Sequence, residues 1–184
     1  MTTTMRKIGI VALALTVAWG SATMGYAADF VTTTSTVTVS VPEVLSISSD
    51  AATFTLPFQG YAKTGDESWA QTVTYTVESN NMRQADSSPA INANLDFLYD
   101  RIDLKADMGD YIKTSGNTSL VEAGSGFVTI GTDNVTLANK GNTDQGSDGK
   151  LLRGTFPVTY KAVATSDVPS GDQIHVLYVT LTTI

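Results

Sequence analysis

Apolar and polar residues alternate along most of the chain, and this alternation predicts β-strands. The clearest stretch is residues 69–77. Trp69, Val73, Tyr75 and Val77 share one face, which Gln71 interrupts, and threonines occupy the other face. Because successive side chains of a strand point to opposite faces, this pattern is typical of a sheet with one buried and one wet side.

Shorter stretches repeat the pattern, and Gly, Pro, Asp and Asn separate them. We predict strands at 44–47, 53–56, 91–100, 102–108, 120–121, 127–130, 135–137, 155–164 and 174–181. Residues 91–100 also fit one helical face, but the strict alternation that follows favours a strand. About eight to ten short strands at this spacing predict an all-β fold, an immunoglobulin-like antiparallel β-sandwich. No second domain is indicated, so we expect one domain over residues 28–184.

The segment from Phe30 to Val41 organises the interpretation. From Val37 it alternates valine with hydroxyl residues, as a strand with one buried face does, and Pro42 ends it. Such a strand at the free end of a β-domain has two fates: it completes its own sheet, or it completes the sheet of a neighbouring molecule. The sequence leaves both open.

The first 27 residues predict a signal peptide. Arg6 and Lys7 precede an apolar run, and Gly25-Tyr26-Ala27 forms a small-residue cleavage box. The run is too short to span a bilayer of ~30 Å. We therefore expect a Sec-type export signal, and a mature protein without a membrane span that is extracellular or on the cell surface, otherwise periplasmic.

Charge and composition exclude several classes of function. Removing residues 1–27 takes away two basic residues and no acidic one, so the net charge of −7 becomes −9. An acidic surface repels phosphate backbones, so nucleic acid is not expected as a partner. The chain has no cysteine, which excludes disulfides and thiolate metal sites.

No constellation of residues predicts catalysis. The single histidine, His175, falls in the last predicted strand on the parity of Leu177, which favours a partly buried strand-end ring over a triad member. No G-x-S-x-G nucleophile motif occurs. A run of carboxylates, Asp96, Asp100, Asp103, Asp107 and Asp110, is best explained as an exposed sheet face. We expect no enzyme and no catalytic residues.

The polar loop at 142–149 has two interpretations. Oxygen side chains at alternate positions and two glycines resemble a calcium loop, but the bidentate Glu at its last position is missing. An ordinary turn explains the same residues and is preferred, so no cofactor or metal ligand is assigned. Several aromatic residues suit either a sugar-stacking platform or core packing, and core packing is favoured: Trp69, Tyr75, Tyr99, Tyr160 and Tyr178.

Both ends of the chain resemble known bacterial surface subunits. The turn Val168-Pro169-Ser170-Gly171-Asp172, the alternating strand to Leu181 and the hydroxyl-rich strand after the signal are similar to spore coat protein U-type and chaperone–usher fimbrial subunits. Those families often carry cysteines, and this chain has none. The resemblance implies assembly by β-strand addition, in which the N-terminal strand of one subunit fills a groove in the next. The assembly residues would be Val37, Val39 and Val41, with Val31 and Thr33 as extensions.

The predicted function is therefore a non-catalytic structural or adhesive subunit of a cell-surface assembly such as a pilus, filament or coat. Its expected partners are further copies of itself and, if the fimbrial resemblance holds, a periplasmic chaperone. The alternative is a secreted carbohydrate- or calcium-binding module.

Overall fold

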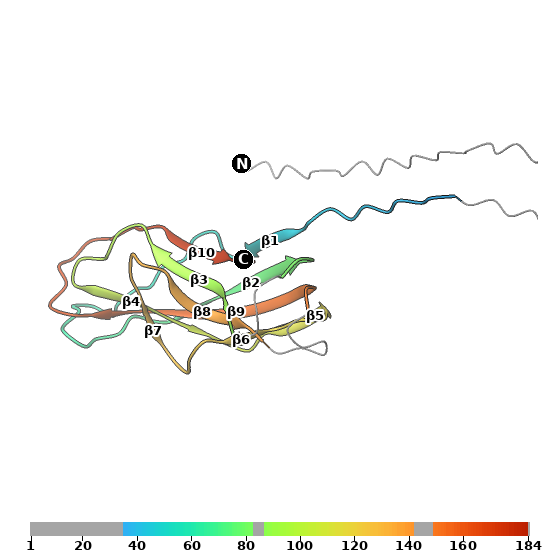
Figure 1. The fold of residues 1–184 in the computed structure, drawn as a ribbon. Helices are drawn as coiled ribbons and strands as arrows, with labels where there is room; N and C mark the ends of the chain where they lie inside the picture. Colours follow the sequence, from blue (N-terminus) through green and yellow to red (C-terminus); the bar gives the residue numbers. More distant parts are fainter. Residues whose placement is uncertain (1–34, 83–86, 142–148, 184) are drawn as a thin grey trace, which may run out of the picture. The chain divides into compact units, whose positions relative to one another are not determined.

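The chain folds into β-strands, and no helix occurs in the part that the structure describes. The computed structural model (Figure 1) describes residues 35–82, 87–141 and 149–183, so the expected signal peptide lies outside the described residues. The chain divides into two units, residues 1–42 and 43–184. No helix of the described residues is long and apolar enough to cross a membrane.

Ten strands in the described part of the 43–184 unit form two antiparallel sheets, an arrangement consistent with a β-sandwich (Figure 1). The first sheet has the order β1-β2-β9-β4-β7, and β5 pairs with β9 beside β4. Its strands are β1 (Leu45–Ser49), β2 (Gln71–Ser79), β4 (Ile102–Met108), β5 (Ile112–Gly116), β7 (Val128–Ile130) and β9 (Leu152–Ala164). The second sheet has the order β10-β3-β8-β6. Its strands are β3 (Pro89–Leu95), β6 (Leu120–Glu122), β8 (Val135–Lys140) and β10 (Leu177–Leu181).

The core combines the inward faces of both sheets. In β2, β4 and β9 every second residue is buried, as the alternation predicts. Tyr75 and Tyr160 meet in the core, where their hydroxyl oxygens are 2.9 Å apart. Phe156 stacks on Tyr75, and Phe54 stacks on Tyr160. Burial raises the pKa of Tyr160 far above its ordinary value, so both hydroxyls stay neutral and hydrogen-bonded.

Several of the predicted strands differ from the observed ones. Residues 53–56 form no strand: Phe54 and Leu56 pack on the core from a loop. Trp69 lies before β2 and is 59% exposed, so it does not share the buried face. β3 ends at Leu95, and residues 96–101 form a loop instead of continuing as a strand.

β5 was not expected, because all five of its residues are exposed and its sequence does not alternate. It pairs with the first residues of β9, opposite Gly154. A side chain at Gly154 would collide with the carbonyl of Ile112 and the ring of Tyr111. The close approach of β5 to β9 therefore requires glycine at this position.

Candidate assembly surface

The N-terminal segment at residues 35–42 contains three of the five predicted assembly residues. None of these eight residues belongs to a strand, and all are exposed. The exposed fractions of Val37, Val39 and Val41 are 65%, 82% and 76%. Val31 and Thr33 lie outside the described residues. The three valines therefore keep their strand-like spacing without a partner strand in the described chain.

At the start of the 43–184 unit, Glu43 and Val44 are hydrogen-bonded to the two residues that follow β2. Asn80 Oδ1 accepts a hydrogen bond from the Val44 N–H at 2.8 Å, and the Asn80 N–H donates to the Val44 carbonyl at 3.2 Å. Asn81 Nδ2 donates to a Glu43 carboxylate oxygen at 2.9 Å. The backbone bond continues the pairing of β1 with β2 by one residue, to Val44, and the Glu43 side chain contacts the chain just after β2.

β10 is one of the two edge strands of the second sheet, and β6 is the other. β10 pairs only with β3 among the described strands. Its inward residues become less exposed along the strand: Leu177 and Val179 are half-buried, and Leu181 is buried. All three contact the core cluster. An edge strand with incompletely covered apolar side chains is a surface on which another strand can pair.

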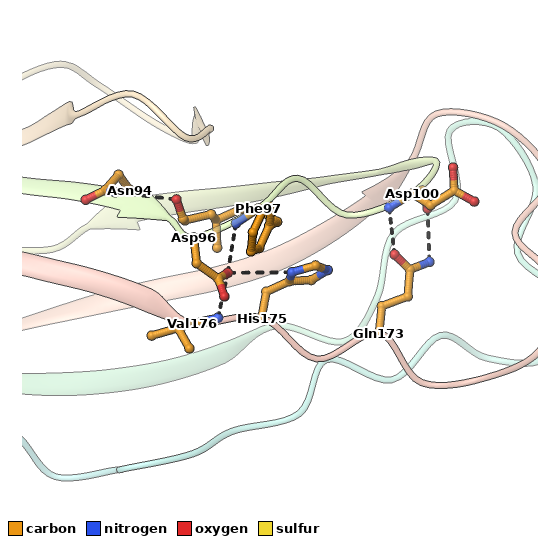
Figure 2. Close-up of polar contacts among 8 residues, drawn as sticks. Asn94, Asp96, Phe97, Asp100, Gln173, His175 and Val176 are labelled. Carbon is orange, nitrogen blue, oxygen red and sulfur yellow. Dashed lines mark hydrogen bonds and ion pairs between the residues drawn. The ribbon is translucent and has the colours of Figure 1, made fainter.

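Three exposed apolar side chains, Phe97, Leu98 and Ile174, lie on segments at the end of the unit where β10 begins. These side chains are 69%, 64% and 88% exposed. Two segments carry them, the β3–β4 loop and the residues that lead into β10, and Figure 2 shows these segments side by side. We call this set the end cluster.

Asp96 fastens these two segments together (Figure 2). One carboxylate oxygen accepts hydrogen bonds from the N–H groups of Phe97 at 2.8 Å and Val176 at 2.9 Å, and the Asp96 N–H donates to the Val176 carbonyl at 3.0 Å. Partial burial raises the pKa of Asp96, but the two hydrogen bonds and the neighbouring His175 outweigh it, so the pKa lies below its ordinary value. The carboxylate is thus held as an anion that clamps the loop to the start of β10.

Gln173 makes a second link between the same segments (Figure 2). Its amide oxygen accepts from the Asp100 N–H at 2.6 Å, and its amide nitrogen donates to the Asp100 carbonyl at 3.0 Å. Arg101 follows in the left-handed region, with φ of 59°, and its guanidinium donates to the Asp167 carbonyl at 2.9 Å. The end cluster therefore rests on a loop with many fixed backbone positions.

His175 also lies at this junction, beside Asp96 and Tyr99. The sequence placed it inside the last strand, but β10 begins only at Leu177. The reason is that the Asp96 carboxylate takes the Val176 N–H in place of a strand carbonyl, so the ladder ends there. The imidazole Nδ1 lies 3.5 Å from an Asp96 oxygen, and the ring packs edge-on to Tyr99 with centroids 4.3 Å apart. Its side chain is 18% exposed, as expected of a partly buried ring.

The remaining candidate residues are dispersed. Asp103 and Asp107 alternate on the outer side of β4, where both are half-buried and not fully exposed as predicted, while Asp96 and Asp100 lie in the β3–β4 loop. Residues 142–148 of the candidate calcium loop lie outside the described residues. Within the described ranges, no three His, Asp or Glu side chains are grouped so that they could hold a metal ion.

The aromatic candidates divide into two groups. Tyr75 and Tyr160 are buried and Tyr99 is half-buried, as core packing predicts, whereas Trp69 and Tyr178 are 59% and 50% exposed. The exposed pair comes from different sheets. Trp69 precedes β2, and Tyr178 lies in β10.

The end cluster is the feature that sequence reasoning missed. Phe97 was placed in a predicted strand and Ile174 in another, and both positions are loops. The neighbouring Phe97 and Leu98 were the only available signal, because two adjacent large apolar residues cannot both face one side of a strand.

No family model matches the sequence, and no curated protein or solved structure matches it either. The resemblance to fimbrial subunits therefore stays a prediction from the two ends of the chain.

Proposed function

We propose that this protein is a non-catalytic structural subunit of an extracellular or cell-surface assembly. In this proposal the N-terminal segment of one copy adds as a strand to a sheet of a neighbouring copy. The observation that carries it is the exposure of Val37, Val39 and Val41 in a segment that forms no strand. Each of these side chains gains hydrophobic free energy only if another surface covers it.

Addition to a neighbouring copy is favoured over folding back onto the same sheet. Glu43 and Val44 are already bonded to Asn81 and Asn80 in line with β1. A fold-back would have to reverse the chain at Pro42 alone. Proline fixes φ at about −65°, whereas the tight hairpin turns of types I′ and II′ need a positive φ at their first central residue, and it restricts Val41 before it to extended conformations.

The absence of cysteine also supports assembly between copies. A small exported domain without disulfides relies on its core or on assembly for stability. Backbone hydrogen bonds of an added strand supply affinity, and alternate side chains supply the register.

The test is electron microscopy of the purified protein without residues 1–27, beside a version that begins at Pro42. We expect filaments or ordered multimers from the longer protein and none from the shorter one. Residues 43–184 form a unit of their own, so circular dichroism should show the same β-structure in both. Filaments from the shorter protein, or a strictly monomeric longer protein at high concentration, would contradict the proposal. A control protein that begins at Val31 retains all three valines and should assemble.

A further inference from the structure

Five strands in the described part of the 43–184 unit have a free side, and they differ as acceptors. β6 and β7 have three residues each, and every residue of β5 is exposed. β1 has a single half-buried residue, Ile47, with both of its ends exposed. β10 alone combines five residues with three apolar side chains that contact the core.

The backbone of β10 is also presented correctly. The Val176 carbonyl accepts from the Asp96 N–H, and the Thr182 N–H donates to the Ala90 carbonyl, so even-numbered residues bond to β3. Hydrogen-bonding direction alternates along an antiparallel strand. The N–H and C=O groups of Leu177, Val179 and Leu181 therefore point toward the free side of β10. These same three residues carry the inward side chains.

The N-terminal segment matches this edge in spacing and character. Its valines recur at every second position, as the inward residues of β10 do. Residues directly opposite in neighbouring strands point to the same face, so valines paired with these residues would also point inward. β10 contains no charged residue and no proline, the features that normally protect an edge strand from pairing.

We propose that β10 of one copy accepts residues 37–41 of a second copy as an antiparallel strand. In this register Val41 lies opposite Leu177, Val39 opposite Val179 and Val37 opposite Leu181. The second sheet then gains a fifth strand, which covers the half-buried side chains of β10. This inference rests on the proposed function and names the surface that the segment uses.

The direction of the added strand determines the kind of assembly. β10 runs toward the end of the unit at which β1 begins. The last residue of β10, Leu181, pairs with Ile91 near the start of β3. The first residue of β1, Leu45, pairs with Ser79 at the end of β2, and β3 is the next strand along the chain, so both positions lie at the same end. An antiparallel strand therefore places the body of the second copy beyond the beginning of β10. That is where the end cluster lies exposed. The contact joins different surfaces of the two copies, so it repeats head to tail and gives an open filament where the rotation between copies does not close a ring.

A parallel strand would place the second body at the opposite end, beside the point where the first copy's own segment begins. The two copies could then exchange segments and close into a symmetric dimer, and the end cluster would stay exposed. Coverage of Phe97, Leu98 and Ile174 therefore favours the antiparallel direction.

Disulfide trapping tests the acceptor strand and its direction, because the natural chain has no cysteine. Cα atoms of a hydrogen-bonded antiparallel pair are about 5.5 Å apart, within the range of a disulfide. We expect the double variant Val41→Cys/Leu177→Cys to give a ladder of covalent multimers after mild oxidation of the assembled protein. The matched control Val41→Cys/Tyr178→Cys, whose second cysteine faces outward, should lose the ladder.

Other patterns of cross-linking would overturn the inference. A ladder or dimer from Val41→Cys/Leu181→Cys instead would show the parallel direction. Cross-links from a Val41→Cys/Ile47→Cys variant alone would make β1 the acceptor. In both cases assembly persists and the proposed function stands. If neither the natural protein nor any variant assembles, the proposed function itself fails.

Amide hydrogen exchange of the unaltered protein gives a second test that needs no substitution. Assembly should slow exchange at the amides of Leu177, Val179 and Leu181, and the outward amides of β1 should keep their monomer rates. Assembled protein with unchanged exchange along β10 would refute the choice of edge even if the cysteine variants failed to fold.

Discussion

Replacing Val39 by alanine separates assembly from folding. Val39 is 82% exposed and belongs to no strand in the described chain, so its truncation should leave the free energy of unfolding of the subunit unchanged. In the proposed assembly its side chain is buried beside Val179. The substitution then removes two carbon atoms from a buried position, at ~0.8 kcal/mol each. A loss of about 1.5 kcal/mol per contact raises the critical concentration for assembly roughly tenfold.

Sedimentation measures the critical concentration, and urea unfolding below that concentration measures the stability of the monomer. The matched control is Thr38→Ala, which changes the adjacent residue on the opposite face and should shift the critical concentration much less. An equal shift for both variants would refute the one-sided burial of the segment. A lower urea midpoint for monomeric Val39→Ala would show that the valine packs within its own subunit.

Three further predictions concern the subunit itself. Tyr160→Phe leaves the buried Tyr75 hydroxyl without its partner at 2.9 Å, and urea unfolding should show a loss of about 1–2 kcal/mol. The folded-state pKa of Asp96 is lowered, so its contribution to the free energy of unfolding is complete above the unfolded pKa of about 3.9 and disappears as the pH falls through the folded pKa. Asp96→Asn should therefore flatten the acid side of a plot of melting temperature against pH. Gly116→Ala places a side chain against a backbone carbonyl at φ of +102°, whereas Gly126 has φ of +82° and open space around it. Thermal melts should therefore show a cost above about 1 kcal/mol for Gly116→Ala and a smaller one for Gly126→Ala.

The fold class was predictable because the alternation is strong where strands are buried on one face. β2, β4 and β9 follow it residue by residue. The prediction at residues 53–56 was wrong because alternation reports side-chain burial and not backbone pairing. Phe54 and Leu56 bury their side chains from a loop whose backbone makes no ladder.

The opposite case is β5, a strand without a hydrophobic signal. Its pairing depends on a glycine in another strand, Gly154, and on the ring of Tyr111 packing beside it. Burial raises the pKa of Tyr111 to about 12. Such pairing comes from tertiary contacts that no local window of sequence contains.

One part of the candidate assembly surface, the valine segment, could be predicted from the sequence, and the other part, the end cluster, could not. The spacing of Val37, Val39 and Val41 is a local pattern and could be read directly. The end cluster could not, because the segments that carry Phe97 and Ile174 are joined by the hydrogen bonds of Asp96 between two loops. The two segments lie far apart in the sequence, and each loop alone was interpreted as part of a strand.

The end cluster matters for the proposed assembly because a five-residue strand is a small contact. Three buried valines contribute roughly 1.5–3 kcal/mol each, while association costs at least about 4 kcal/mol in lost translational and rotational freedom. Net hydrogen bonds of the added strand contribute about 1 kcal/mol each and must also offset the ordering of the segment. A strand alone therefore leaves little surplus, and a lasting filament requires contact between the bodies of the subunits. Phe97, Leu98 and Ile174 offer that contact only in the antiparallel direction, so the register of the strand and the polarity of the filament are one structural choice.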